Sequence, residues 1–374
     1  MSYFLIPKIN NIIVVNPKLE EYTGDYEIQL SHSLFNFHDT LHRKIINTCI
    51  AVDNENTSII SDISDNTTYE NIVQCVNPHE YIFSTVPGSK LSVSKLNTKT
   101  SLFYDFLEVS ISLNIFDVYK YNKSINVLHI TPNHSDSVEC YELLRENFCD
   151  NVAKYDEINE ETTTSIGDNK YDFIFLEIKT TTKIKITPYI CSFIENIMVI
   201  LRNQKIEGNA VIKINHIFHK QITDILFILS SLYEKVYILK PNSSNITTFE
   251  KYIICKKFQS NENNCKIHKL NYFKLSSVLK NSTNKQINTI LDYEIPYYFT
   301  MKLNDINMII GQQQLESLNT ILNLLKNKNK EDRYDIMKKT NIHKAVMWCE
   351  KYKIPCNKFN DKINIFLPIN TEGD

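Results

Sequence analysis

The sequence predicts an α/β fold, in which a mostly parallel sheet carries helices on both faces, after an N-terminal extension and before a helical C-terminal region. Buried-strand patterns alternate with helical patterns from about residue 95 to residue 258, which favours a parallel sheet. The last two strands, 236–239 and 252–255, are joined by a loop without a helix, so we expect them to pair antiparallel. With 374 residues and 43% hydrophobic side chains, the chain can form one large domain with additions, or two domains.

The first quarter of the chain has the weakest pattern. Residues 1–90 alternate short apolar runs with polar stretches, and residues 53–69 are rich in Ser, Thr and Asn, a composition typical of loops. We therefore expect an N-terminal extension that is mostly β or irregular. From residue 99 onwards apolar residues fall first at helical spacing and then in continuous runs. The elements expected here are a helix near 101–111, a buried strand at 125–130, a turn at 131–137, a helix at 138–148, a polar loop at 156–170 and a buried strand at 171–176.

Thr187 and Pro188 mark the start of the next helix, because Thr is a good N-cap and Pro is well tolerated at the first helical position. The elements expected after it are a strand at 210–214, a helix near 222–232, strands at 236–239 and 252–255, and mainly helices beyond residue 266. A parallel sheet that ends in an antiparallel hairpin at its edge is the layout of class I methyltransferases. Other doubly wound folds share this pattern.

Composition limits the classes of function. The chain has 41 basic and 43 acidic residues, so a nucleic acid would have to bind at a local basic patch. Nine cysteines form no CxxC pair, which indicates free thiols in a reducing compartment such as the cytoplasm, and not a disulfide frame or a zinc site. No apolar run is long enough for a signal peptide or a membrane span. The six glycines lie well below the roughly 7% of average usage, and no two of them could form the glycine-rich turn that usually holds a nucleotide cofactor.

Residues 208–258 carry the most specific pattern. They read Gly-Asn-Ala-Val-Ile-Lys-Ile, a helix, Val-Tyr-Ile-Leu-Lys-Pro-Asn-Ser-Ser-Asn, and then Glu-Lys-Tyr-Ile-Ile-Cys-Lys. This resembles the second half of the FtsJ-type family of S-adenosylmethionine-dependent RNA 2′-O-methyltransferases, in the branch found in large DNA viruses. The resemblance covers residues 95–258. It implies a class I methyltransferase (Rossmann-like) domain at 91–260, between the extension at 1–90 and a mainly helical region at 261–374.

The resemblance also implies a catalytic tetrad of Lys, Asp, Lys and Glu, in which a lysine takes the proton from a ribose 2′-hydroxyl. The central lysine falls on Lys213 and the glutamate on Glu250. The aspartate position holds Glu177, which keeps the charge and adds a methylene group. The first lysine position, within Phe-Tyr-Asp-Phe-Leu-Glu, holds Asp105, which reverses the charge. We expect these residues to share one cleft at the C-terminal ends of the strands, with the carboxylates raising the pKa of Lys213.

The family's cofactor loop follows its first strand, with an acidic residue and an Ala-Pro-Gly-Gly-like turn. Here the corresponding segment, 127–136, contains no glycine. The candidate cofactor-binding residues on it are His129, Thr131, Asn133, Ser135 and Asp136. We expect weak or no binding of S-adenosylmethionine, because side chains stand where close contact with the backbone is needed.

Several of these residues also have simpler explanations. Lys213 could be an ordinary lysine at a strand end, and Glu250 a solvated loop carboxylate. His129 and His134 could suggest a metal site, but no further ligand has the required spacing, so we expect none. Three lysines after the strand at 171–176 could line an RNA path or simply form a solvated loop; they are Lys179, Lys183 and Lys185.

Two functions follow from the resemblance. The first is a non-catalytic, methyltransferase-like RNA-binding or scaffolding module, with a catalytic partner subunit. The alternative is an active S-adenosylmethionine-dependent mRNA cap (ribose 2′-O) methyltransferase with a divergent site. In either case the expected partner is RNA, including capped mRNA, and not a membrane. The expected location is the cytoplasm, including a viral factory or a virion.

Overall fold

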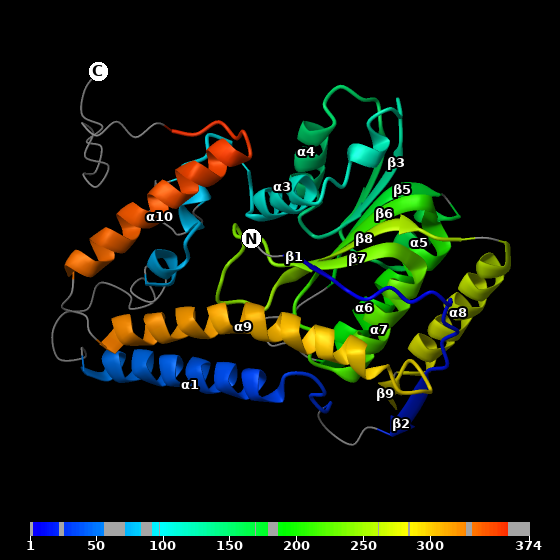
Figure 1. The fold of residues 1–374 in the computed structure, drawn as a ribbon, viewed down its shortest axis with the longest axis horizontal. Helices are drawn as coiled ribbons and strands as arrows, with labels where there is room; N and C mark the ends of the chain where they lie inside the picture. The colour runs from blue at the N-terminus through cyan, green and yellow to red at the C-terminus, as the bar shows by residue number, and fades with distance from the viewer. Residues whose placement is uncertain are drawn as a thin grey trace.

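The computed structural model describes residues 3–21, 26–55, 72–83, 92–96, 98–168, 170–178, 186–260, 262–282, 285–326 and 331–357. A seven-stranded sheet forms its centre, in the order β1-β7-β8-β6-β5-β3-β4 (Figure 1). The strands are β1 (Tyr3–Leu5), β3 (Asn126–Ile130), β4 (Asn151–Tyr155), β5 (Tyr171–Glu177), β6 (Gln204–Ile214), β7 (Tyr233–Leu239) and β8 (Lys251–Phe258).

Strand directions confirm the predicted fold class. Strands β4, β3, β5 and β6 pair in parallel, and β8 pairs antiparallel with both β6 and β7. The predicted hairpin is therefore present. It does not form the edge of the sheet, however, because β1 adds to β7 in antiparallel pairing. The N-terminal segment thus covers what would otherwise be an open sheet edge.

The central strands form because their residues are apolar on both faces. Along β5, for example, Ile174 and Leu176 pack in one core cluster while Phe173 and Phe175 pack in the other, as the alternation of side chains along a strand requires. The first cluster includes α6 (Ile186–Asn203) and α7 (Lys220–Leu232), and the second includes α3 (Leu102–Ser112) and α4 (His134–Leu144). Figure 1 shows these two pairs of helices on opposite faces of the sheet.

Three elements differ from the sequence-based expectation between residues 134 and 170. The predicted helix at 138–148 is α4, which begins and ends about four residues earlier. Strand β4 was not predicted, because it is only half-buried and lacks a continuous apolar run. The predicted polar loop at 156–170 contains α5 (Glu160–Ile166), whose N-cap Asn159 accepts a hydrogen bond from the Thr162 backbone N–H at 2.7 Å.

The C-terminal region is helical, as predicted, and consists of α8 (Glu262–Asn281), α9 (Tyr297–Lys326) and α10 (Glu331–Lys351). It also contains the unpredicted strand β9 (Lys285–Thr289), which pairs antiparallel with β2 (Lys18–Glu21).

The N-terminal extension was expected to be mostly β or irregular, and this was wrong for residues 32–55, which form helix α1 (His32–Glu55). In Figure 1, α1 lies alongside α9 for most of its length. Leu34, Leu41 and Ile45 lie at helical spacing and pack against the C-terminal helices. Polar residues are frequent in this segment, so its narrow apolar stripe could not be recognised from the sequence as one face of a helix.

We expect Gly311→Val to destabilise the fold. Gly311 is where α9 approaches α1: a Cβ atom there would lie 2.3 Å from Leu34 Cδ2 and 2.9 Å from Leu34 Cγ. Leu34 is itself buried, so overpacking should lower the free energy of unfolding by about 1–3 kcal/mol in urea titrations. Asn319→Val, at an exposed position of the same helix, is the matched control. Equal stability of the two variants would contradict close α1–α9 packing.

Candidate functional site

Three of the predicted tetrad positions meet at the C-terminal ends of β5 and β6. Glu177 and Lys213 are register partners on these two parallel strands, and Lys213 is also paired across β8 with Tyr252. Glu250 immediately precedes β8. Because β8 runs antiparallel to β6, its first residues lie beside the last residues of β6. The topology of the sheet therefore explains why these three residues, far apart in the sequence, are neighbours.

Lys213 forms an ion pair with Glu177, with 2.9 Å between Nζ and Oε1. Its Nζ lies 4.0 Å from Oε1 of Glu250. Burial alone would lower the pKa of Lys213. The charges of Glu177 and Glu250, the hydrogen bond that Lys213 donates to Glu177 and the charge of Asp105 outweigh burial and raise this pKa above its ordinary value. The amine is therefore held as an ammonium ion at neutral pH, which is the reverse of what a proton-abstracting lysine requires.

Asp105 projects from α3 toward the same cluster. It is 3% exposed and accepts hydrogen bonds from Ser243 Oγ at 2.6 Å and from the Tyr252 hydroxyl at 3.4 Å. Burial raises the pKa of Asp105 to about 7, although Ser243 and Lys213 both favour its charged form. The four tetrad positions thus form one cluster with three carboxyl groups and a single lysine.

We expect Asp105→Asn to change how stability depends on pH. The folded-state pKa of Asp105 lies above its unfolded value of 3.8, so the folded state binds more protons and this group's contribution falls as pH rises from about 4 to about 7. The asparagine variant lacks this loss. Compared with the native chain, it should therefore gain on the order of a few kcal/mol between pH 5 and pH 8 in urea titrations. An identical pH profile for the two proteins would show that Asp105 is not buried in this way.

Glu108, one helical turn after Asp105, is a site residue that the sequence analysis did not single out. It is fully buried and accepts hydrogen bonds from the backbone N–H groups of Asn242 and Ser243 at 3.1 and 3.0 Å. It also accepts one from Trp348 Nε1 of α10 at 2.9 Å. One carboxylate therefore joins α3, the 240–250 loop and the C-terminal helix. Glu108 is the last residue of the Phe-Tyr-Asp-Phe-Leu-Glu segment, and this position in the sequence could have identified it as a site residue.

Lys240 is a second residue that was missed. Its Nζ donates to the backbone carbonyls of Thr248 and Glu250 at 2.8 and 3.0 Å. Burial lowers its pKa to about 8, against the attraction of Glu250 and Asp105. This lysine closes the loop that carries Glu250, and so it positions that carboxylate beside Lys213. The Lys-Pro sequence at 240–241, directly after a predicted strand, could have identified Lys240 as a residue of the site.

The predicted cofactor-binding residues separate into two groups. Thr131 lies at the site: it is fully buried and its hydroxyl donates to Glu177 Oε2, while the Asn133 N–H donates back to the Thr131 hydroxyl at 3.2 Å. Asp136 is turned away, because it accepts from the Lys99 N–H at 3.2 Å and from the Thr100 hydroxyl. Ser135 is half-buried in the first turn of α4.

His129 lies in the core and not at the site. Its ring is fully buried, stacks on Phe175 at 5.6 Å between centroids and contacts Ser137 Oγ at 2.9 Å through Nδ1. Burial lowers its pKa to about 3, so the imidazole is neutral. This agrees with the simpler of the two explanations for a histidine at this position. Within the described part of the chain, no group of three His, Cys, Asp or Glu side chains could hold a metal ion.

Asp156, immediately after β4, is a further residue that was missed, because β4 itself was not predicted. Its Oδ1 lies 3.4 Å from Nε2 of His134, across the end of the sheet. The cavity beneath is lined in part by Ile130, Asp156 and Glu177 and measures about 10 Å³. Ligand pockets are typically about 300–1,000 Å³, so this cavity has no room for S-adenosylmethionine, the cofactor that the resemblance implies, with the side chains in their present positions.

Other expectations have mixed outcomes. Lys179, Lys183 and Lys185 lie outside the described residues. All nine cysteines are free thiols, as predicted. Trp348 is buried on α10. Among the helices that the structure describes, none is both long and apolar enough to cross a membrane.

Comparison with known proteins identifies the family. The model of the family described as FtsJ-like methyltransferase matches residues 31–258, which is more than half of the chain. The match begins inside the segment expected to be an extension and ends close to the expected boundary at 260. No curated protein matches the chain.

Solved structures with similar folds include a protein described as a ribosomal RNA methyltransferase from Plasmodium falciparum. It is 16% identical, with a TM-score of 0.35, over 44% of this chain and 100% of that one. Another is a probable spermidine synthase from Corynebacterium glutamicum, 9% identical, with a TM-score of 0.31, over 55% of this chain and 89% of that one. Neither likeness is close enough to carry an argument about function.

Proposed function

Because the chain belongs to the FtsJ-like methyltransferase family, whose members generally use S-adenosylmethionine, we propose that it has kept the fold and the RNA partner of the family and does not transfer methyl groups. It acts as an RNA-binding or scaffolding module. Methyl transfer in the same assembly is then the task of a separate catalytic subunit.

The closed cofactor end of the sheet carries this proposal. In an open α/β sheet the ligand lies outside the C-terminal ends of the strands. Here that space is bridged on one side by the Thr131–Glu177 hydrogen bond and on the other by the His134–Asp156 contact. A cavity of about 10 Å³ remains. The Asp156 side chain is 72% exposed, so the closure rests mainly on the bond between Thr131 and Glu177. The loop also has no glycine that would let its backbone approach a cofactor closely.

The charge balance of the tetrad positions supports the same function. Lys213 is kept protonated by Glu177 and Glu250, and Asp105 adds a third carboxyl group where the family has a lysine. A general base must be neutral to accept a proton, and an additional cation nearby would favour that form. Lys240, another lysine close to Glu250, donates to two backbone carbonyls.

A second candidate is an active mRNA cap 2′-O-methyltransferase with a divergent site. The close grouping of Lys213, Glu177 and Glu250 favours it, because this is the arrangement in which the family's lysine and carboxylates would contact a ribose. On this reading the cofactor end opens only when RNA is bound.

Two measurements on the full chain separate these functions. We expect calorimetry to detect no saturable binding of S-adenosylmethionine at micromolar concentration, and we expect no transfer of label from the cofactor to capped or uncapped RNA. The double variant Asp105→Lys with Glu177→Asp restores the family's tetrad and tests whether the closed cofactor end alone prevents catalysis. It should also be inactive. Asp105→Ala is the control that removes the carboxyl group without adding a lysine.

The possible outcomes are distinct. Methyl transfer by the native chain, at a rate that Lys213→Ala abolishes, would establish the second candidate. Transfer by the double variant alone would show that the cofactor end can open and that only the tetrad has decayed. Failure of the native chain to bind any RNA in a filter or anisotropy assay would remove RNA as the partner and overturn the proposed function.

A further inference from the structure

Two cavities lie next to each other on the side of α6 that faces α5 and α8. Their volumes are about 760 and 970 Å³, and Arg202 and Tyr272 line both of them. The larger one is lined by residues from the N-terminal ends of β5 and β6, including Lys170 and Lys205. β5 has seven residues, so this groove is roughly 20 Å from the tetrad, at the opposite end of the strands.

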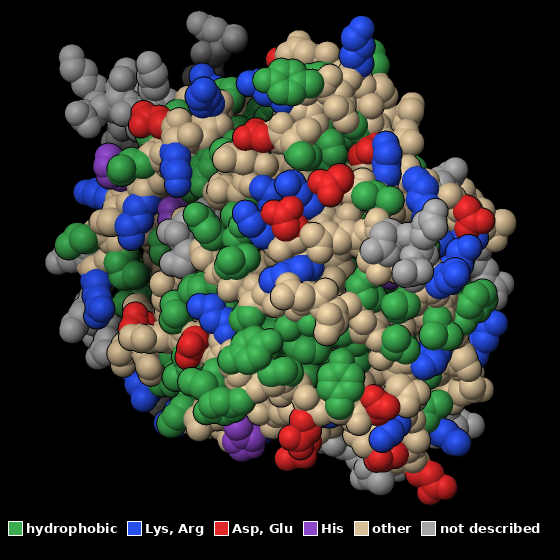
Figure 2. Space-filling model, turned by 45° about the vertical axis from the view of Figure 1, so that its right-hand side comes forward, with side chains coloured by type: hydrophobic (Ala, Val, Ile, Leu, Met, Phe, Trp, Pro, Cys, Tyr) green, Lys and Arg blue, Asp and Glu red, His purple; other side chains and the backbone are tan. Residues whose placement is uncertain are grey.

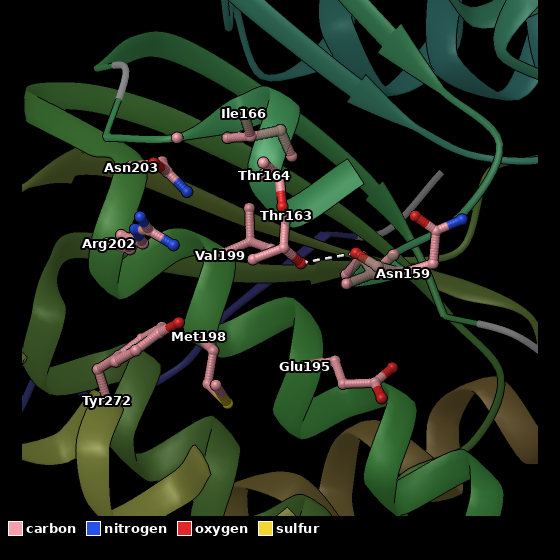
Figure 3. A pocket seen from close by; sticks show the side chains of 12 residues that line it. Asn159, Thr163, Thr164, Ile166, Glu195, Met198, Val199, Arg202, Asn203 and Tyr272 are labelled. Carbon is pink, nitrogen blue, oxygen red and sulfur yellow. Dashed lines mark hydrogen bonds between the residues drawn. The ribbon is translucent and has the colours of Figure 1, made fainter. Parts of the chain in front are cut away.

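The smaller cavity has apolar walls and a polar end. Ile166 and Val199 belong to its walls, and Arg202, Asn203 and Tyr272 bring a guanidinium, an amide and a hydroxyl group to one end. Figure 3 shows these three side chains grouped on one side of the pocket, with Thr163 and Thr164 of α5 across from them. The pocket therefore combines apolar side chains with hydrogen-bonding groups, and Glu195 also contributes a carboxylate to its lining.

The larger cavity is cationic. Four basic side chains line it, Lys170, Arg202, Lys205 and Lys269. Arg202 pairs with Asp168 and Lys205 pairs with Asp172, each at 2.7 Å, so Lys170 and Lys269 supply the excess positive charge. The whole chain, by contrast, has a net charge of −2. Figure 2, which turns the right-hand side of Figure 1 forward, shows basic side chains mixed with acidic and hydrophobic ones on the face it presents, and not one continuous basic face. The basic cluster around this groove is thus a local feature.

Aromatic side chains accompany these cations. Phe273 lines the larger cavity and is 68% exposed, and Tyr272 lies between the two cavities. A single exposed phenyl ring is ordinary at a protein surface, but this one borders both a cavity and basic side chains. Aromatic rings interleaved with basic groups are the features with which proteins hold single-stranded nucleic acid, by stacking on bases and pairing with phosphates.

Each cavity also contains a buried polar atom without a partner. Asn203 is 2% exposed and its Oδ1 accepts no hydrogen bond, and His268 is 4% exposed and its Nε2 has no partner. Burial lowers the pKa of His268 to about 4, so its ring is neutral. More than about nine in ten buried polar groups in proteins are paired. Two of the sixteen such side-chain atoms among the described residues lie in these adjoining cavities, where polar groups at the edge of a ligand would pair with them.

We infer that these two cavities form a binding site for a nucleotide unit of single-stranded RNA. The base enters the smaller cavity, where its edge meets Asn203 and its faces meet the apolar walls. The phosphate lies in the larger cavity beside Lys170 and Lys269, and a neighbouring base stacks on Phe273. Only the choice of RNA over a free nucleotide rests on the proposed function. The site gives the non-catalytic module an RNA contact away from the tetrad.

The test is fluorescence anisotropy with the full chain and a labelled single-stranded RNA of mixed sequence, about 12 nucleotides long, at low salt. Lys269→Glu and Phe273→Ala alter exposed positions of the groove. Lys266→Glu and Leu270→Ala are their matched controls, at exposed positions of the same helix that do not line either cavity. We expect each groove variant to weaken binding about fivefold or more and each control by less than about twofold.

Further arms identify the source and class of the ligand. Titration of nucleoside monophosphates separates a free nucleotide from an RNA strand, and a glutamate-rich peptide tests an acidic protein partner. A photoreactive uridine in the RNA should cross-link to the α8 peptide that contains Tyr272 and Phe273. Preference for the acidic peptide over RNA and nucleotides, or unchanged RNA binding by both groove variants, would overturn the inference.

The two proposals can fail separately. RNA binding with cross-links only near 240–250, and with no effect of the groove variants, overturns the groove site and leaves the proposed function in place. Methyl transfer by the native chain overturns the non-catalytic function, and the groove is still judged by its own variants. Absence of binding to RNA and to nucleotides overturns both.

Discussion

Replacing Lys213 with methionine is expected to lower the free energy of unfolding by about 3–5 kcal/mol, because it leaves buried carboxylates without their cation. Glu177 is 2.9 Å from the lost ammonium group, its side chain is 16% exposed, and Asp105 is nearly inaccessible to solvent. Urea unfolding at pH 7 measures the loss. Lys235→Met, at an exposed position of β7 with a 4.0 Å contact to Glu234, is the matched control and should cost less than about 0.5 kcal/mol.

A double variant separates charge from packing. Lys213→Met combined with Glu177→Gln removes both charges of the ion pair, and the new amide can still meet the Thr131 hydroxyl. It should be more stable than Lys213→Met alone, because unpaired charge and not lost volume dominates the cost. If Lys213→Met lowers the free energy of unfolding by less than about 1 kcal/mol, the ion pair is solvated. Buried carboxylates would then not hold Lys213 in its protonated form.

The same electrostatic attraction acts on both the stability of the fold and the protonation of Lys213. The attraction that holds Lys213 between Glu177 and Glu250 stabilises the folded chain. The same attraction raises the pKa of the lysine. In the family's tetrad a second lysine would oppose that rise, and here its position holds Asp105. We therefore interpret the cluster as structural in its present form.

The central strands could be predicted because each of them contains a run of consecutive apolar residues. The runs at 125–130 and 171–176 are apolar on both faces, and only a strand covered on both sides uses such a run. β4 and α1 could not be predicted in this way. β4 is an edge strand with one half-buried face, and α1 buries only a narrow stripe against α9. The apolar residues of β4 and α1 can be recognised as buried only when the neighbouring element is known.

Some residues of the candidate site could likewise be predicted from the sequence, and others could not. Lys213, Glu177 and Glu250 were brought together by the resemblance and by strand register, both of which the sequence contains. Asp156 was missed because the strand that presents it was missed. The path of the 240–250 loop was not predictable either, because it depends on a buried carboxylate from α3 and on an indole from α10, more than 100 residues away on each side.

The buried carboxylate of Glu108 is expected to contribute strongly to the stability of the fold and to hold the 240–250 loop in place. Glu108→Ala removes the acceptor of three hydrogen bonds at once, from the N–H groups of Asn242 and Ser243 and from the Trp348 indole. An unsatisfied buried donor costs about 1–3 kcal/mol, so the free energy of unfolding should fall by about 3 kcal/mol or more. Hydrogen exchange should also accelerate at the 242 and 243 amides, because the loop loses its anchor to α3.

Two controls determine whether Glu108 acts through these bonds. Glu108→Gln keeps one carbonyl oxygen in place and should cost less than the alanine change. Trp348→Phe removes a single donor while it keeps most of the ring contacts with Tyr104 and Tyr352, and it should leave exchange at the two loop amides nearly unchanged. If Glu108→Ala is as stable as Trp348→Phe, then Glu108 does not anchor the loop. The position of Glu250 beside Lys213 is in that case held by Lys240, through its two bonds to the backbone of the same loop, and by Gln314, which donates to the Thr248 carbonyl.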